Sequence, residues 1–285
     1  MRLILFLGLS LSVSMLTAQI AHPKASPFSQ LVQEIGLTKI TVAYSRPAVR
    51  ARKIFGDLVP YGRIWRVGAN ESTKFTTDTD ITVMGNTLQK GTYALYAFPN
   101  ENNWEIVFHK NITHWGDGRK AYNQDEDAFR VSVSPQKISH TQENFLITFE
   151  NIDHNAANME WIWENTRIII PIKVPTEKQM LLEIEKQLAS NPTAQTYYEA
   201  ARYLQEQNKE YSRALDYLKN AIRLGGDTYY FHRLKSLVEA ALGDYKAAIR
   251  SAKLSLNLAQ KEDKDEFVRM NQKNIIAWEQ LVIKK

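Results

Sequence analysis

Hydrophobic and polar residues alternate in short segments between residues 38 and 175, a period of two that is typical of half-buried β-strands. In the segment from Phe145 to Phe149, for example, residues 145, 147 and 149 fall on one face. Glycine, proline, asparagine and aspartate separate the segments, as turns require. The pattern predicts an antiparallel β-sandwich or barrel, with strands at 38–44, 81–84, 87–89, 93–98, 104–109, 129–133, 145–152, 159–163 and 166–172.

From residue 176 onward the apolar spacing becomes that of helices, and Pro192 ends the first of them. Tyr211 and Ala214 recur 34 residues later as Tyr245 and Ala248. A period of 34 with a Tyr-x-x-Ala core resembles the tetratricopeptide repeat, in which a small alanine lets paired helices approach closely. The match is degenerate, and a plain helical bundle is the alternative. Helices are predicted at 176–190, 193–207, 210–224, 228–242, 244–259 and 264–283.

The first residues carry a different pattern. Arg2 supplies a positive charge, residues 3–16 are apolar apart from small Gly and Ser, and Ala18 is a small residue before a cleavage point. The apolar run is shorter than the roughly 20 residues that a membrane span needs, and no later stretch is long and apolar enough to span a bilayer. We therefore interpret residues 1–18 as a secretory signal peptide, with an uncleaved anchor as the alternative. The protein is expected to be exported, periplasmic or secreted, with a β-sandwich domain at 19–174 and a helical repeat domain at 175–285.

The amino-acid composition excludes several kinds of functional site. The 285 residues include no cysteine, which excludes disulfides, thiolate metal sites, a thiol nucleophile and a lipid-anchor cysteine. The formal net charge of +5 is shared between both halves and is too small for a dedicated nucleic-acid-binding surface. The sequence contains neither a phosphate-binding glycine-rich loop with lysine nor a Gly-x-Ser-x-Gly elbow, and we expect no cofactor.

Positive charge does concentrate in one segment, residues 44–74, which holds seven Arg and Lys against two acids. Two prolines and three glycines make much of it loop, and loops on a rigid sheet are where binding sites tend to lie. Arginine suits carboxylate, phosphate or sulfate. The segment therefore predicts an anionic or glycan ligand held by Arg46, Arg66, Asn70 and Glu71. The alternative is structural: the arginines pair with acids elsewhere in the sheet.

The same segment carries a set of motifs: Ser45-Arg46-Pro47, Arg52-x-Ile54-Phe55-Gly56, Leu58-Val59-Pro60-Tyr61-Gly62 and Trp65-Arg66-x-Gly68-Ala69-Asn70-Glu71-x-Thr73. Together with Gly91-Thr92-Tyr93, Trp104, Trp115-Gly116 and Glu143-x-Phe145, they resemble the exported bacterial family called domain of unknown function 2911, over about residues 26–174. The resemblance implies an exported β domain, here followed by a helical tail, and it supplies no catalytic residue. Ala51 and Val67 stand where Gly and Thr are usual in that family, so a site lined by them would differ in shape.

Other candidate chemistry is weaker. His109, His114 and Asp117 form the closest cluster of metal-binding residue types, at a predicted strand end and the loop after it. Zinc sites need three ligands in tetrahedral order, which this spacing does not enforce, so no metal site is predicted. The acidic run at 125–127 lacks the alternating ligands and glycine of Ca²⁺ loops and is interpreted as a solvated loop. Trp161 and Trp163 share one strand face and are interpreted as core rather than as a platform for sugar rings. Trp65 is likewise interpreted as core.

Three functions stay open. The first is an exported binding protein whose β domain holds the ligand and whose helical repeats hold a protein or peptide partner, since such repeats form concave surfaces. The second is a structural envelope scaffold without a small-molecule site. The third is a hydrolase or lyase of envelope or polysaccharide material that uses Glu71, although Arg66 nearby would keep that carboxylate ionised, which is unfavourable in a general acid. We expect a binding protein rather than an enzyme.

Overall fold

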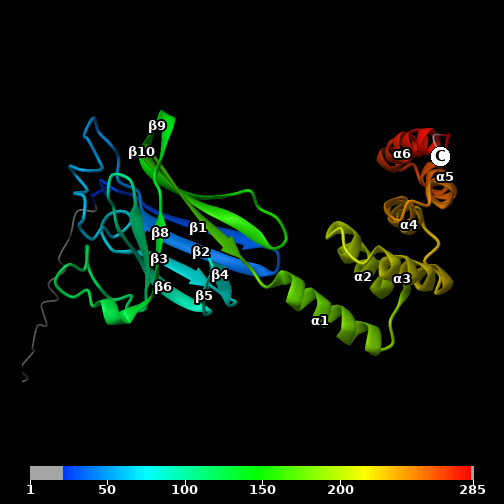
Figure 1. The fold of residues 1–285 in the computed structure, drawn as a ribbon, viewed down its shortest axis with the longest axis horizontal. Coiled ribbons are helices and arrows are strands. Elements are labelled where there is room, and N and C mark those ends of the chain that lie inside the picture. The colour runs from blue at the N-terminus through cyan, green and yellow to red at the C-terminus, as the bar shows by residue number, and fades with distance from the viewer. Residues whose placement is uncertain (1–21, 284–285) are drawn as a thin grey trace, which may run out of the picture. The chain divides into compact units, whose positions relative to one another are not determined.

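The structure is a computed structural model that describes residues 22–283 and divides into two compact units, one ending at Thr176 and the other beginning at Glu177 (Figure 1). The predicted signal peptide at 1–18 lies outside the described residues. Strands make up the first unit and helices the second, which confirms the predicted β part followed by an α part. Within residues 22–283, no helix is long and apolar enough to cross a membrane.

Six antiparallel strands form the larger sheet, in the order β1-β2-β3-β6-β7-β8. The period of two decides which side faces the core: Ile40 and Val42 of β2 are buried, whereas Lys39 between two buried neighbours is exposed. The sequence pattern does not predict β1, whose residues are mostly exposed or half-buried, or the short β3. The strands are β1 (Phe28–Ile35), β2 (Thr38–Ser45), β3 (Thr73–Thr77), β6 (Gly91–Phe98), β7 (Trp104–His109) and β8 (Asp127–Val133).

Four strands form the smaller sheet, in the order β5-β4-β10-β9. β4 (Ile81–Val83) and β5 (Asn86–Leu88) make the predicted hairpin, with Met84 and Gly85 in its turn at φ of 48° and 88°. The register of β10 (Ala156–Lys173) against β9 (Gln136–Glu150) shifts around Glu164, whose φ is 53°, and this marks a β-bulge. Because the bulge interrupts the alternation, the sequence predicts two strands where the structure has one.

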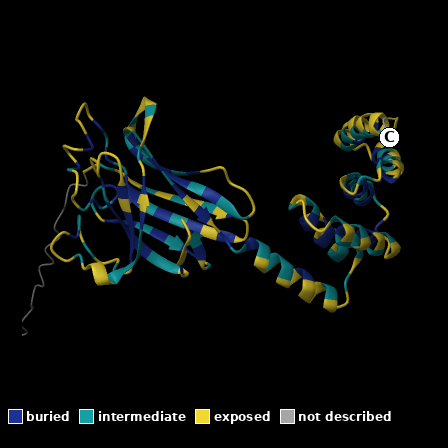
Figure 2. Ribbon diagram, in the orientation of Figure 1, coloured by how far each residue is buried: buried dark blue, intermediate teal, exposed yellow. Residues whose placement is uncertain are grey.

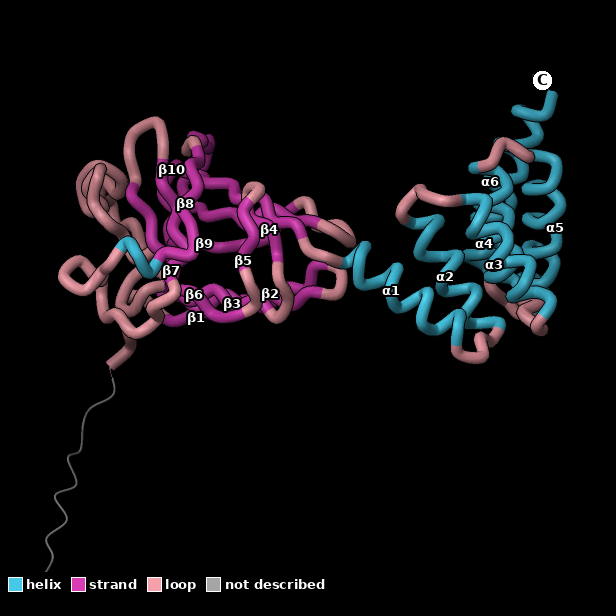
Figure 3. Tube along the Cα trace, turned by 60° about the horizontal axis from the view of Figure 1, so that its bottom comes forward, coloured by secondary structure: helices cyan, strands magenta, loops and turns pink. Residues whose placement is uncertain are grey.

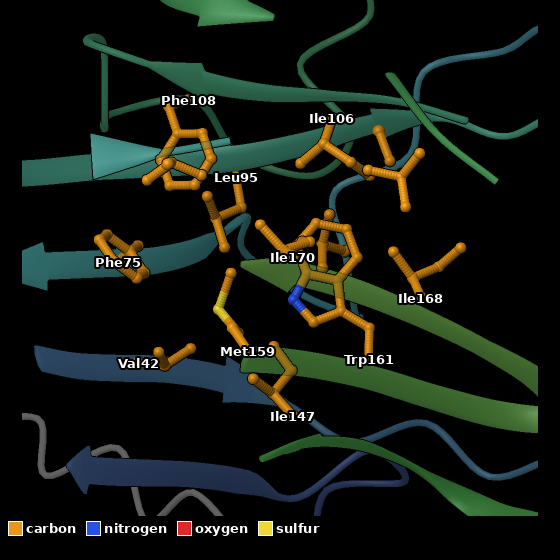
Figure 4. Packing of buried hydrophobic residues seen from close by; sticks show 14 of the residues in the cluster. Val42, Phe75, Leu95, Ile106, Phe108, Ile147, Met159, Trp161, Ile168 and Ile170 are labelled. Carbon is orange, nitrogen blue, oxygen red and sulfur yellow. The ribbon is translucent and has the colours of Figure 1, made fainter. Parts of the chain in front are cut away.

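The apolar core lies between the two sheets, which face each other (Figures 1 and 4). Phe75 and Phe108 come from the larger sheet and Met159 and Trp161 from the smaller one, and all four are at most 2% exposed. Two separate sheets with their own edges make a sandwich rather than a closed barrel. Trp163 is also 2% exposed, so the prediction that Trp161 and Trp163 belong to the core is confirmed.

The second unit consists of six helices, each within two residues of its predicted bounds (Figures 2 and 3). Helix α2 contacts α3 and α4, and α4 contacts α5 and α6, as expected for stacked helical hairpins. Residues 34 positions apart are buried together, since Ala214, Ala248, Leu218 and Ala252 are all 0% exposed. The helices are α1 (Thr176–Ala189), α2 (Ala194–Glu206), α3 (Tyr211–Arg223), α4 (Tyr229–Ala241), α5 (Tyr245–Lys261) and α6 (Asp265–Ile283).

Candidate functional site

The loop of residues 46–72 joins β2 to β3 and is fixed to one end of the sandwich by its aromatic side chains; Figure 1 shows it in blue to cyan. Trp65 is 6% exposed, and its ring stacks on that of Trp163, with centroids 6.0 Å apart. It also meets the ring of Trp104 edge-on at 5.9 Å. Phe55 packs against the same two tryptophans, at 4.7 and 6.1 Å. Trp65 is therefore core, as predicted, and it holds the loop in place.

Main-chain carbonyl oxygens hold three arginines of this loop. Nε of Arg46 donates to the carbonyl oxygen of Phe145 at 2.9 Å, and Nη2 of Arg50 donates to that of Ala25 at 3.4 Å. Arg52 donates to two carbonyl oxygens of its own loop, at 2.6 and 3.0 Å. Across residues 22–283, no arginine of the loop forms an ion pair with an acid. Because carbonyl oxygens carry no net charge, these guanidinium groups are oriented while their charges stay uncompensated.

Beside the loop lies a cavity of about 400 Å³. Its apolar wall is built from Pro47, Leu58, Val59, Pro60, Ile64, Trp65 and Trp163. The charged part of the lining holds five cations and one anion, and it consists of Arg50, Arg52, Arg63, Arg66, Arg119 and Asp117. The cavity is therefore strongly positive.

Two residues of the lining contain buried N–H groups that the protein leaves unsatisfied. Nε of Arg66 and Nε1 of Trp163 have no hydrogen-bond partner within the part of the chain that the structure describes. An unsatisfied buried donor costs about 1–3 kcal/mol, and native structures contain few of them. Both residues belong to the lining of the cavity.

Asp117 compensates one of the five positive charges. Its carboxylate Oδ2 lies 2.6 Å from Nη2 of Arg119, on the segment of residues 110–123 that follows β7. Burial acts to raise the pKa of Asp117, but the backbone N–H and guanidinium of Arg119, with the charge of Arg66, outweigh it and lower that pKa below its ordinary value. Asp117 is thus ionised at neutral pH, and the other four guanidinium groups have no acid in the lining.

The structure brings one of the four sequence-predicted binding residues, Arg66, to this cavity. Arg46 is occupied by the carbonyl oxygen of Phe145 and does not line it. Nδ2 of Asn70 donates to Ser45 Oγ at 3.0 Å and to a second oxygen of the protein, which gives Asn70 a positioning role in the loop. The side chain of Glu71 is exposed outside the cavity, and its backbone bridges that of Trp115.

Sequence reasoning missed most of the residues that do line the cavity. Arg50, Arg52 and Arg63 lie in the basic segment, but nothing in their spacing separates them from Arg46. Arg119 and Asp117 come from a segment far away in the chain. The excess of arginine in the sequence indicates the loop as a whole. Which of its arginines line the cavity is decided by the folded path of the chain.

Four non-glycine residues of the loop have a positive φ, and they are Arg50, Ala51, Val67 and Asn70. Ala51 has a φ of 57° and the buried Val67 a φ of 54°, in the left-handed region that costs roughly 1–2 kcal/mol for a residue with a Cβ. The hydroxyl of Thr73 donates to the carbonyl oxygen of Val67 and holds it there. Glycine adopts a positive φ without steric cost, which is a physical reason for the glycine usual at position 51 in the family that the motifs resemble. At position 51 the loop thus has the backbone conformation that glycine favours, although the residue is alanine.

A second polar cluster lies on the face of the larger sheet that is turned away from the core, beside Tyr96. Asp127 is its centre: Oδ1 lies 2.8 Å from Nδ1 of His109, and Oδ2 accepts from the hydroxyl of Tyr122 at 2.7 Å and from Nε of Arg130 at 2.8 Å. Burial and the hydrogen bond to Asp127 raise the pKa of Tyr122, so its hydroxyl stays a donor. The side chain of Asp127 is only 7% exposed, and the prediction of a solvated loop at 125–127 is wrong for this residue.

Comparison with protein families identifies the β unit. The family model described as protein of unknown function (DUF2911) matches residues 26–172, more than half of the chain. The matched span contains all five cavity arginines and the His109–Asp127 cluster. Neither a curated protein nor a solved structure matches the chain.

Proposed function

The chain belongs to the DUF2911 family of proteins of unknown function, and from this premise and the geometry of its β unit we propose that it is a binding protein for a small organic anion. One observation carries the proposal: a cavity of about 400 Å³ is lined by five guanidinium groups and a single carboxylate. A guanidinium group presents a fixed fork of donors that matches carboxylate, phosphate or sulfate and does not lose its charge. No acid neutralises four of the five, so the attraction is available to a ligand.

The lining also supports a ligand class. A volume of about 400 Å³ lies within the ~300–1,000 Å³ typical of small-molecule sites. The accessible part of the apolar wall, formed by Leu58, Pro60 and Ile64, suits a hydrocarbon body, while the arginines suit its acidic group. We therefore propose a carboxylate, phosphate or sulfate carried on a sugar-sized body.

Replacing Arg66 with glutamine is expected to weaken binding of the preferred anion by about 10- to 100-fold. A hydrogen bond to a charged group contributes roughly 1.5–3 kcal/mol, and about 1.4 kcal/mol corresponds to a tenfold change in affinity. Isothermal titration calorimetry with sugar phosphates, sulfated sugars, uronic acids and small dicarboxylates identifies the anion and measures the loss. The same titration is then repeated with Arg66→Gln.

Lys53→Gln is the matched control, because Lys53 belongs to the same loop and carries the same charge but does not line the cavity. It should change the affinity by less than about threefold, as a surface charge acting through screened solution does. Equal weakening by both variants would mean that net charge, not the cavity, attracts the anion. Absence of binding for every anion tested would refute the proposed function.

We also propose that the protein is exported. The support is the pattern of residues 1–18, with Arg2, an apolar run and Ala18. The intact mass of the protein recovered from the periplasm or the medium should correspond to a chain that begins at Gln19. A mass that includes residues 1–18 contradicts cleavage at this point.

For the helical unit we propose a protein or peptide partner with an acidic segment. The stacked repeat supports this, as does a cavity of about 400 Å³ between α3, α4 and α5 that contains Lys219, Lys235, Glu239 and Arg250. Lys235 pairs with Glu239 at 2.6 Å and Lys219 with Asp216 at 3.0 Å, so Arg250 is the cation of this lining without an ion pair among residues 22–283. Binding of glutamate-rich peptides to the full chain should weaken in Arg250→Ala and persist in Arg269→Ala, a control on α6. Peptides that bind both variants equally, or not at all, speak against this partner.

A further inference from the structure

A cluster of potential metal ligands is formed by residues that do not line the arginine-lined cavity. His109 ends β7, His114 lies in the segment that follows, and Glu126 belongs to η1 (Gln124–Glu126), the single 3-10 turn before β8. The backbone N–H of Lys110 donates to the carbonyl oxygen of Glu126 at 2.9 Å and closes the two ends of this segment on each other. As a result, one potential ligand atom from each of the three residues lies within 4.8 Å of the other two.

The geometry of His109 is the independent sign of a ligand. Its side chain is 0% exposed, and its Nδ1 lies 2.8 Å from Oδ1 of Asp127. A carboxylate on one ring nitrogen fixes the imidazole so that the other nitrogen offers its lone pair, which is how most metal-binding histidines are oriented. That other nitrogen, Nε2, is buried without a hydrogen-bond partner and lies 3.4 Å from Oε2 of Glu126, inside the cluster.

Asp127 is well placed as the orienting group. Tyr122 and Arg130 also donate to its carboxylate, at 2.7 and 2.8 Å, so its position does not depend on His109 alone. Its side chain is 7% exposed, which keeps water from competing for the contact with the imidazole. A carboxylate that is itself held by hydrogen bonds is typical of the second layer around a metal site.

We propose that His109, His114 and Glu126 bind a divalent transition-metal ion, with Zn²⁺ as the best match, and that Asp127 positions His109. Two imidazoles and one carboxylate are a ligand set that zinc sites use when a fourth position is left open. Ligand atoms about 2.0–2.2 Å from zinc in tetrahedral order lie roughly 3.3–3.6 Å apart. Nε2 of His109 is already 3.4 Å from Oε2 of Glu126, and since no pair of ligand atoms is more than 4.8 Å apart, the closure needed is at most about 1.5 Å. His114 and Glu126 are half-buried on loop and turn segments, where such a movement is accommodated.

The acid in this cluster differs from the one that the sequence suggests. The sequence places Asp117 as the acid nearest to His109 and His114 and predicts no metal site. Asp117 instead pairs with Arg119 at 2.6 Å in the lining of the arginine-rich cavity. Glu126 takes its place because the chain returns to the end of β7 after the segment of residues 110–123.

Calorimetric titration of the tag-free, chelator-treated protein with ZnCl₂ tests the proposal. We expect one Zn²⁺ per chain with a dissociation constant in the micromolar range or tighter. His114→Ala and Glu126→Gln should each weaken binding at least tenfold, and both replace half-buried side chains, so the fold is retained. Replacement of Zn²⁺ by Co²⁺ should give the visible absorption of a tetrahedral site in the wild type and lose it in His114→Ala.

Two control variants show whether zinc binds at this cluster. His140→Ala removes an exposed histidine of the same unit and should leave zinc binding unchanged. Arg66→Gln should also leave it unchanged, so the metal site and the anion cavity can fail independently. If no stoichiometric zinc binds, or if His114→Ala binds as the wild type does, the proposal is overturned. His109 then has only a structural role between Asp127 and Glu126.

Discussion

Replacing Trp65 with alanine is expected to lower the free energy of unfolding of the β unit by about 3–5 kcal/mol, the usual cost of truncating a buried aromatic residue to alanine. The side chain is 6% exposed, and its ring contacts those of Phe55, Trp104, Phe145 and Trp163, at centroid distances from 5.2 to 6.0 Å. Its loss leaves a cavity at the end of the sandwich and releases the loop that carries four of the five cavity arginines. Anion binding should therefore be lost together with stability.

Urea unfolding followed by tryptophan fluorescence measures the change, because every tryptophan except Trp278 lies in the β unit. Circular dichroism at the helical band reports the other unit, whose transition should not move. Tyr61→Ala is the matched control, since this aromatic residue of the same loop is 41% exposed and its truncation should cost less than about 1 kcal/mol. Comparable losses in both variants would show that Trp65 does not anchor the loop.

Gly36→Ala is expected to destabilise the β unit by about 3 kcal/mol. Gly36 lies in the turn between β1 and β2 at a φ of +55°, where a Cβ costs roughly 1–2 kcal/mol of backbone strain. A Cβ there would also overlap the hydroxyl of Thr176 and the main-chain carbonyl oxygen of His154. Relief of such overpacking costs a further ~1–3 kcal/mol, because the Thr176 hydroxyl also accepts from the N–H of Leu37, at 3.3 Å.

Gly85→Ala is the control that measures backbone strain without steric overlap. Gly85 is also a turn residue, with a φ of +88°, but nothing lies within 4 Å of the position of its Cβ. The substitution should therefore cost only about 1 kcal/mol, the strain alone. The urea midpoints of the two variants give the comparison, and equal shifts would contradict the overlap at Gly36.

The regular elements that the sequence predicts well are those with local signals. Caps and breakers such as Pro192 and Gly243 set the helix ends within two residues. The beginning of β9 at Gln136 and the continuity of β10 across Glu164 depend on pairing between the two strands, so no local pattern shows them. The start of α1 likewise depends on a tertiary contact, since the Thr176 hydroxyl accepts from the N–H of Leu37, while Oε1 of Gln179 has no partner among residues 22–283.

The same difference between local signals and tertiary contacts applies to the candidate sites. An excess of arginine in one loop is a property of composition, so the sequence indicates the basic segment and Arg66 within it. Which side chains meet is decided by the path of the chain, which brings Arg119 and Asp117 to the cavity and Glu126 to His109. The burial of the Asp127 side chain likewise depends on its contact with Tyr122 in the folded chain. The acidic run in which Asp127 lies does not indicate it.

The arginines held by carbonyl oxygens have a consequence for handling the protein. A guanidinium cluster that the chain does not neutralise recruits counter-anions from the medium, and an ion that binds only the native state raises the melting temperature by mass action. Sulfate or phosphate buffers should therefore shift the melting of the β unit upward relative to chloride, at equal ionic strength, and leave that of the helical unit in place. Screens for the physiological ligand are best run in zwitterionic buffer with chloride, in which the cavity is not already occupied.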